Sequence, residues 1–266
     1  MTLTRTTDAE VDASDVDDGP ETTGSPATRV LGIASLGALV LWALYGLWWS
    51  PPDVEQGDGV RLFYVHVPSA ILAYGGCFLT TLASAMWLRR RTPGWDALAS
   101  AGAELGLVFV TITIAAGSLW GRITWGTYWT WDARLTSTAL LAVMLLGYVA
   151  LRRVEITPSG SVRAAVLGLL LLPNVLIVNR SVEWWRSLHQ EATITKLDPS
   201  IEGEMLVAFA VGMVAGLLVF AWLLIHRFRV AWLEQQVERH DLDAAVAARR
   251  AEAGVAPSAE PAEVTA

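Results

Sequence analysis

Hydrophobic residues in this chain gather into six long runs, and charged residues are concentrated in the segments between them. A helix rises about 1.5 Å per residue, so about 20 apolar residues cross the ~30 Å hydrocarbon layer of a bilayer. Pro68 fits the first turn of the second run, and Pro173-Asn174 interrupts the fifth. The pattern predicts six transmembrane helices, at about Val30–Trp49, Pro68–Leu88, Ala97–Leu119, Leu135–Leu151, Val162–Val178 and Met205–Ile225.

Arginine clusters give these helices an orientation. Arg89-Arg90-Arg91 joins the second run to the third, Arg152-Arg153 joins the fourth to the fifth, and Arg227 follows the sixth. Short cytoplasmic loops of membrane proteins are enriched in Lys and Arg. The expected fold class is therefore an all-α polytopic membrane protein with both termini in the cytoplasm, and the loops at about 50–67, 120–134 and 179–204 face outward.

Three regions are expected along the chain. Residues 1–28 form an acidic, disordered tail, residues 29–226 form the six-helix membrane domain, and residues 227–266 form a cytoplasmic helix followed by a disordered tail. A hydrophobic content of 53% with only 17% charged residues agrees with a multi-pass protein of the cell membrane surrounded by lipid. No basic stripe stands apart from the membrane-flanking arginines, so nucleic-acid binding is not indicated.

The outward loops collect the residues that carry chemistry. Of four histidines, only His66 and His189 lie in them. Residues 120–131 contain four of the 13 tryptophans, whereas an average window of this length holds about 0.6, from 12 × 13/266. Tryptophans at the headgroup level often form an aromatic belt, and this alternative stays open. Packed indole faces in one loop also form a flat apolar surface, on which a porphyrin stacks well.

Imidazole is a common axial ligand of heme iron, so His66 and His189 together suit a heme held between two loops. Structural zinc needs about four ligands and catalytic zinc about three, so two distant histidines fit zinc poorly. Arg122 and Arg134 are placed to pair with the heme propionates, or are ordinary boundary arginines. Asp132 fits the N-cap of the fourth helix.

Two further features concern the third outward loop and the single cysteine. If Trp184–Gln190 is helical, Trp185 and His189 stand four residues apart and share a face. Cys77 is the only cysteine, so the chain has neither an internal disulfide nor a CxxCH site for covalent heme attachment.

The loop segment Trp125-Gly126-Thr127-Tyr128-Trp129-Thr130-Trp131-Asp132-Ala133-Arg134, preceded by Gly117-Ser118-Leu119-Trp120-Gly121, resembles the tryptophan-rich WWD motif of heme-handling membrane proteins. With His66-Val67-Pro68 upstream, Trp184-Trp185-Arg186-Ser187-Leu188-His189 downstream and six spans, the chain is similar to the heme exporter protein C family, CcmC. The resemblance covers roughly residues 30–226. Tyr128 stands where family members often have Trp, and it keeps an aromatic face.

The resemblance implies a function and a set of site residues. Heme b is held transiently at the outer face, with His66 and His189 as the axial ligands of the iron. The heme-binding residues it implies are His66, Trp120, Trp125, Tyr128, Trp129, Trp131, Asp132, Arg134, Trp184, Trp185 and His189. The WWD loop 120–134 lies against the heme, and the protein is expected to be a handling scaffold rather than an enzyme.

The resemblance also implies partners. The heme passes to the membrane-tethered heme chaperone CcmE, and an ABC-type complex of CcmA and CcmB helps release the loaded chaperone. A small subunit, CcmD, often accompanies these proteins.

Alternative functions remain at this point. The first is a component of a WWD-type cytochrome c synthase, or heme lyase, which usually has more spans and histidines within the membrane. The second is a membrane b-type cytochrome that uses heme for electron transfer, a function that more often places paired histidines deep inside helices. A pore that conducts heme has little support, because the spans lack an obvious polar path.

Overall fold

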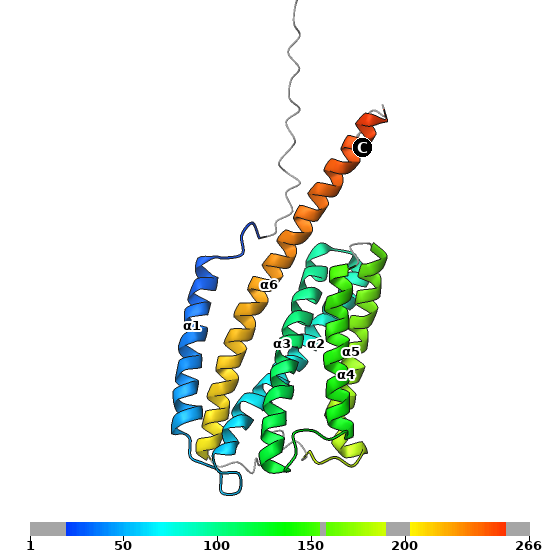
Figure 1. The fold of residues 1–266 in the computed structure, drawn as a ribbon. Coiled ribbons are helices and arrows are strands. Elements are labelled where there is room, and N and C mark those ends of the chain that lie inside the picture. Colours follow the sequence, from blue (N-terminus) through cyan, green and yellow to red (C-terminus); the bar gives the residue numbers. More distant parts are fainter. Residues whose placement is uncertain (1–19, 155–157, 190–202, 254–266) are drawn as a thin grey trace, which may run out of the picture.

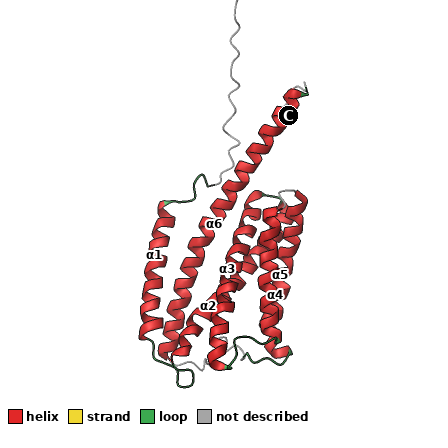
Figure 2. Ribbon diagram, viewed as in Figure 1, coloured by secondary structure: helices red, strands yellow, loops and turns green. Residues whose placement is uncertain are grey.

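A computed structural model describes residues 20–154, 158–189 and 203–253 of the chain, and within these ranges every regular element is a helix (Figure 2). The elements are α1 (Pro26–Trp42) with a π-helix at Ala43–Trp49, a 3₁₀ helix at Asp58–Leu62, α2 (Phe63–Arg90), α3 (Pro93–Thr124), α4 (Ala133–Val154), α5 (Pro158–Trp184) and α6 (Gly203–Glu252). Among these described residues, six helices are long and apolar enough to cross a membrane. The predicted fold class, an all-α bundle with six spans, is confirmed.

The helices run side by side, in the order α1, α6, the pair α2 and α3, and the pair α4 and α5 (Figure 1). The start of α1 and the end of α6 lie at the same end of the bundle. The arginine-rich turn at Arg89–Arg91 lies at that end too, which we call the cytoplasmic end. The opposite end, with the longer connections, is the outer end.

Apolar side chains cover the outside of the bundle. Val30, Ile33 and Leu36 on α1 are each about two-thirds exposed, and α4 likewise exposes Val143 and Leu146. Side chains of this kind are stable at such positions when lipid surrounds them. The chain is thus a multi-pass membrane protein.

The boundaries of α2 and α5 differ from those expected. α2 begins at Phe63 because the 3₁₀ helix leads straight into it, and Phe63 and Tyr64 pack into a buried cluster. Pro68 therefore lies beyond the first turn, and His66 belongs to the helix rather than to the preceding loop. α5 continues through Pro173 to Trp184, so the expected interruption does not end this helix.

The chain ends also differ in part from the expectation. Ser25 caps α1 by accepting from the Thr28 amide, so residues 26–28 of the expected tail are helical. α6 is one continuous helix, and no break separates its apolar half from the expected cytoplasmic helix. Residues 1–19 and 254–266, which carry most of the two expected disordered tails, lie outside the described residues.

Glycines let α2 and α3 approach closely. A Cβ added at Gly76 would lie 2.7 Å from the Gly106 backbone and 2.8 Å from the Gly102 carbonyl oxygen, which is closer than real side chains come. Backbone contact of this kind is typical of helix pairs in membranes. The hydrophobic effect does not drive helices together in lipid, so small residues that let the backbones pack closely stabilise the pair instead. The contact fixes the register of α2 against α3.

The two helix pairs are joined mainly at the cytoplasmic end. Arg152 of α4 donates to both carboxylate oxygens of Asp96 on α3, at 2.7 and 2.6 Å. The Thr81 hydroxyl of α2 donates to the Gly168 carbonyl of α5 at 2.8 Å. On the other side of α3, Arg227 of α6 donates to Glu104, with 2.7 Å between Nη2 and Oε1. Toward the outer end, the pair α2 and α3 and the pair α4 and α5 enclose a cavity.

We expect Gly76→Ala to destabilise the bundle, because the new methyl group forces α2 away from the α3 backbone. Overpacking of this kind costs about 1–3 kcal/mol. The measurement is thermal unfolding in detergent. Gly75→Ala is the matched control, since a Cβ at Gly75 meets no atom within 4 Å. Equal unfolding temperatures for the two variants would contradict the close contact.

Candidate functional site

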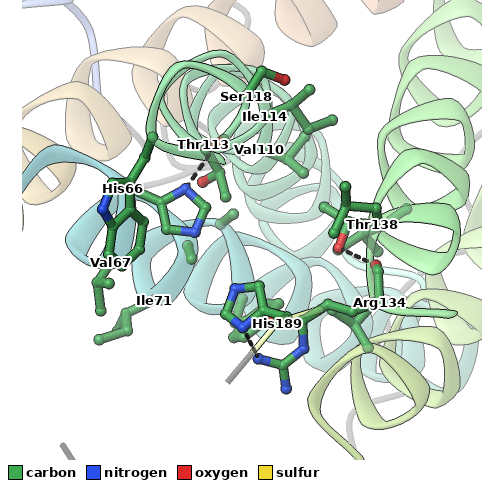
Figure 3. Close-up of a pocket in the computed structure, with 18 of the residues that line it drawn as sticks. His66, Val67, Ile71, Val110, Thr113, Ile114, Ser118, Arg134, Thr138 and His189 are labelled. Carbon is green, nitrogen blue, oxygen red and sulfur yellow. Dashed lines mark hydrogen bonds between the residues drawn. The ribbon is translucent and has the colours of Figure 1, made fainter. Parts of the chain in front are cut away.

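A cavity of about 270 Å³ lies between the outer halves of α2, α3, α4 and α5 (Figure 3). Most of its wall is apolar, and His66, Arg134 and His189 bring the strongest polar groups to it. A mostly apolar cavity with a few converging polar groups is the usual form of a small-molecule site. The lining residues are Phe63, His66, Val67, Ala70, Ile71, Ala73, Tyr74, Val110, Thr113, Ile114, Gly117, Ser118, Trp120, Trp125, Trp129, Arg134, Leu135, Thr138, Leu141, Val178, Asn179 and His189.

His66 is held in a defined orientation by α3. Its Nδ1 lies 2.9 Å from the Thr113 carbonyl oxygen, which only accepts, so Nδ1 carries the proton and donates. Nε2 then has the lone pair and points into the cavity (Figure 3). Gly117 makes room for the ring, because a Cβ there would lie 2.6 Å from His66 Cε1. The arrangement suits a ligand for a metal ion, since metal-binding histidines usually donate from the other nitrogen.

His189 faces His66 across the cavity, from the segment that follows α5. The two ring centroids are 6.3 Å apart and the planes differ by 36°. The guanidinium of Arg134, in the first turn of α4, approaches His189 Nδ1 at 3.3 Å. The two histidines predicted from the sequence are thus neighbours, although they come from segments more than 100 residues apart.

The aromatic residues predicted for the site divide into two groups. Trp120, Trp125 and Trp129 line the cavity. Trp120 lies against His66 with centroids 5.7 Å apart, and Trp125 meets His189 edge-on at 5.8 Å. The other aromatic residues of the set, Tyr128, Trp131, Trp184 and Trp185, are each more than half exposed and do not line it.

The exposed group has partners of its own. The Arg122 guanidinium lies over the Tyr128 ring, at 5.8 Å from its centroid, and does not line the cavity. Trp184 and Trp185 meet edge-to-face, and α5 ends at Trp184. The sequence predicts a shared face for Trp185 and His189 if Trp184–Gln190 is helical. Both residues lie beyond the end of the helix, so they do not share a helical face, and Gln190 lies outside the described residues.

The first part of the expected loop 120–134 is helical, because α3 continues to Thr124. Trp120 thus projects from a helix, and its indole N–H donates to Gln56 Oε1 at 2.7 Å. Trp129 is held differently. Its Nε1 is buried and finds no acceptor among the residues that the structure describes. A buried donor without a partner beside a cavity is the kind of group that a polar ligand satisfies.

Asp132 joins two parts of the site without lining the cavity. Its Oδ1 accepts from the Leu135 amide at 2.8 Å and caps α4, as predicted. Its Oδ2 accepts from the Ser187 hydroxyl at 2.6 Å and from the Leu188 amide at 3.2 Å. The carboxylate therefore ties the segment that carries His189 to the start of α4.

Arg134 is the cation of the cavity wall. Its Nη2 donates to the Asn179 carbonyl at 2.8 Å and its Nε to the Ser181 hydroxyl at 3.5 Å. In the described residues, the hydrogen bonds of Arg134 go to neutral partners, whereas the partly buried arginines Arg152 and Arg227 at the cytoplasmic end face carboxylates. A guanidinium held in this way keeps its charge available for an anionic ligand.

Sequence reasoning missed several residues of the wall, among them Tyr74, Thr113 and Asn179. Tyr74 lies eight residues after His66 in α2, with Ala70 halfway, so the helical period places all three on one face. This spacing in the sequence could have identified Tyr74 as a residue of the cavity wall. Thr113 contributes its backbone carbonyl, which no side-chain pattern reveals.

A second cavity, of about 350 Å³, adjoins the first toward the 53–57 turn. It is more polar, and Glu55, Gln56 and Thr124 contribute to its lining. Trp120, Trp125 and His189 belong to the walls of both cavities. These three side chains therefore separate an apolar chamber inside the bundle from a polar chamber at the outer end.

Comparison with known proteins matches residues 21–243 to the model of the family described as heme exporter protein C, CcmC. Among the relatives, heme exporter protein C of Haemophilus influenzae is 34% identical over 222 residues, covering 81% of this chain and 87% of the relative. The protein of the same name from Bradyrhizobium diazoefficiens is 38% identical over 217 residues, covering 79% and 81%. That of Escherichia coli K12 is 35% identical over 200 residues, covering 75% and 81%. The chain belongs to the heme exporter protein C family.

Proposed function

We propose that this protein binds heme b transiently at its outer end, with His66 and His189 as axial ligands, and delivers it for c-type cytochrome maturation. The observation that carries the proposal is the pair of imidazoles that face each other across a cavity walled by Trp120, Trp125 and Trp129. Family membership supports it, and a relative in Marchantia polymorpha bears the name of a putative cytochrome c biosynthesis ccmC-like mitochondrial protein.

The separation of the imidazoles fits an iron ion between them. An imidazole nitrogen binds a transition metal at about 2 Å and lies about 1 Å from the ring centre, so two coaxial ligands place their ring centres about 6 Å apart. The observed 6.3 Å agrees with that value. The tryptophans supply apolar faces beside the ring, and Arg134 is the partner for a propionate.

The difference between the two histidines suits a carrier that gives its cargo away. His66 is fixed within α2, whereas His189 lies on a segment outside the helices and beside the polar chamber. The next acceptor in our proposal is the heme chaperone CcmE, with CcmA and CcmB assisting its release and CcmD as an accompanying subunit. The protein then needs no bond-making chemistry of its own and acts as a handling protein rather than an enzyme.

The first test is the heme content and absorption spectrum of the protein purified in detergent. We expect the wild type to contain six-coordinate b-type heme, and His66→Ala and His189→Ala each to lose one axial ligand or the heme. His226→Ala is the control, because His226 also packs against a tryptophan, Trp222, but lies outside the cavity. Heme absent after reconstitution, or unchanged in both site variants, would refute the assignment.

A second test addresses the room that His66 needs. Gly117→Ala places a methyl group against the imidazole and tilts it away from the iron position. We expect heme affinity to fall about 10–100-fold, as for other changes in the support of a metal ligand. In Gly147→Ala, the control, the new methyl group meets only Leu167 at 3.8 Å. Titration with heme measures both affinities, and equal values would contradict the role of Gly117.

Delivery to the chaperone is tested by mixing. We expect purified CcmE, added to the heme-bound protein, to change the heme spectrum and then to carry heme away. The chaperone should take up heme much more slowly from an equal concentration of free heme in detergent. If the spectrum stays constant and all heme remains with this protein, delivery to CcmE is wrong, even where the histidine site is right.

A further inference from the structure

The ring nitrogens of the two histidines face opposite kinds of partner. His66 Nδ1 faces a carbonyl oxygen, which only accepts. His189 Nδ1 faces the guanidinium of Arg134, which only donates. A neutral imidazole carries one proton, on one of its two nitrogens. His66 therefore has its proton on Nδ1 and its lone pair on Nε2, and neutral His189 has the reverse arrangement.

This difference matters for metal binding. A histidine that binds a metal through Nε2 has its proton on Nδ1 and donates it to an acceptor. His66 already meets that requirement. His189 does not, because a proton on Nδ1 would face the donor group of Arg134 at 3.3 Å. While this contact lasts, Nε2 of His189 holds a proton in place of the lone pair that iron needs.

The contacts of Arg134 allow it to exchange His189 for another hydrogen-bond partner while most of its guanidinium stays in place. Its Nη2 and Nε hold the guanidinium to α5 through the Asn179 carbonyl and the Ser181 hydroxyl. Only Nη1 turns toward His189. Because Arg134 also lines the cavity, a carboxylate of a bound ligand can take over Nη1. The hydrogen bond from Arg134 to a neutral imidazole has one charged partner, whereas a bond to a carboxylate joins two opposite charges and adds their Coulomb attraction, so the carboxylate displaces the imidazole.

Resting on the proposed function, we propose that the hydrogen bond from Arg134 prevents His189 from binding iron until a heme propionate reaches Arg134. The propionate then takes the place of the imidazole, and His189 becomes available as a ligand. His189 then gives its Nε2 proton to water and takes one from water at Nδ1, so no net proton is lost and no electron moves. The Nε2 lone pair forms the bond to iron. When the cargo departs, the same steps run backward. His66 is the permanent ligand, and His189 is the one that leaves first.

The histidine tautomers of the heme-free protein provide the first test. ¹⁵N-histidine NMR in detergent, at mildly alkaline pH where imidazole is neutral, distinguishes the protonated nitrogen of each ring. His226→Ala with His240→Ala leaves only the two site histidines to assign. We expect the proton on Nδ1 in His66 and on Nε2 in His189. In Arg134→Met, the Nδ1 resonance of His189 should lose the shift caused by its hydrogen bond. Arg122→Met, the control, should leave it unchanged.

The second test uses the heme-bound protein in its ferrous state with carbon monoxide, which is diamagnetic and open to the same NMR measurement. Carbon monoxide should replace His189, whose resonances lose the shifts of an iron ligand, while His66 stays bound.

The outcomes separate the two proposals. A Nδ1 proton on His189 in the heme-free protein, or displacement of His66 by carbon monoxide, overturns the role of Arg134 while the site between two histidines stands. Failure of the wild type to bind heme overturns the proposed function, and the role of Arg134 falls with it.

Discussion

The contact between α2 and α3 at Gly76 determines where the functional groups of these two helices meet. In an antiparallel pair, each step along one helix is matched by a step back along the other. Gly76 lies against Gly106. Ten residues earlier in α2 is His66, and eleven residues later in α3 is Gly117, whose missing side chain leaves room for the imidazole. The Thr113 carbonyl that orients His66 belongs to the same register. A shift of α2 along α3 would remove both the hydrogen bond that orients His66 and the space that its ring occupies.

The charges of the protein are arranged differently at the two ends of the bundle. At the cytoplasmic end, Arg152 and Arg227 face Asp96 and Glu104, and these pairs join helices. Ion pairs of this kind satisfy charges that would be costly within the membrane. At the outer end, Arg134 is held by neutral acceptors in the described residues. The structure thus uses its charges for assembly at one end and leaves a cation for binding at the other.

Much of the fold was predictable because hydrophobic length and arginine position depend on local sequence alone. All six spans were found in this way. The start of α2 was missed because a proline normally marks a first turn, whereas here the 3₁₀ helix at Asp58–Leu62 adds helix ahead of Pro68. The end of α5 at Trp184 depends on long-range contacts, since Asp132 draws Ser187 and Leu188 toward α4.

The site was predictable in part. His66, His189 and the tryptophan cluster stand out as rare residue types in outward segments, and the cavity brings both histidines and three of these tryptophans together. The inward or outward direction of each tryptophan was not predictable, because it depends on where α3 ends and how the next residues turn. Contacts of backbone carbonyls, such as those of Thr113 and Asn179, leave no trace in the side-chain pattern.

The unbroken course of α6 connects the cytoplasmic end of the protein to the wall of the cavity. Arg227, bound to Glu104 of α3, joins this helix to the bundle partway along its length. From Arg227, α6 runs 18 residues back to Phe209, about 27 Å, and 25 residues on to Glu252 at its cytoplasmic end, about 38 Å. Phe209 touches Phe63, and Phe63 touches Trp120 beside His66. A continuous path of helix and aromatic contacts therefore joins the cytoplasmic half of α6 to the aromatic wall of the cavity.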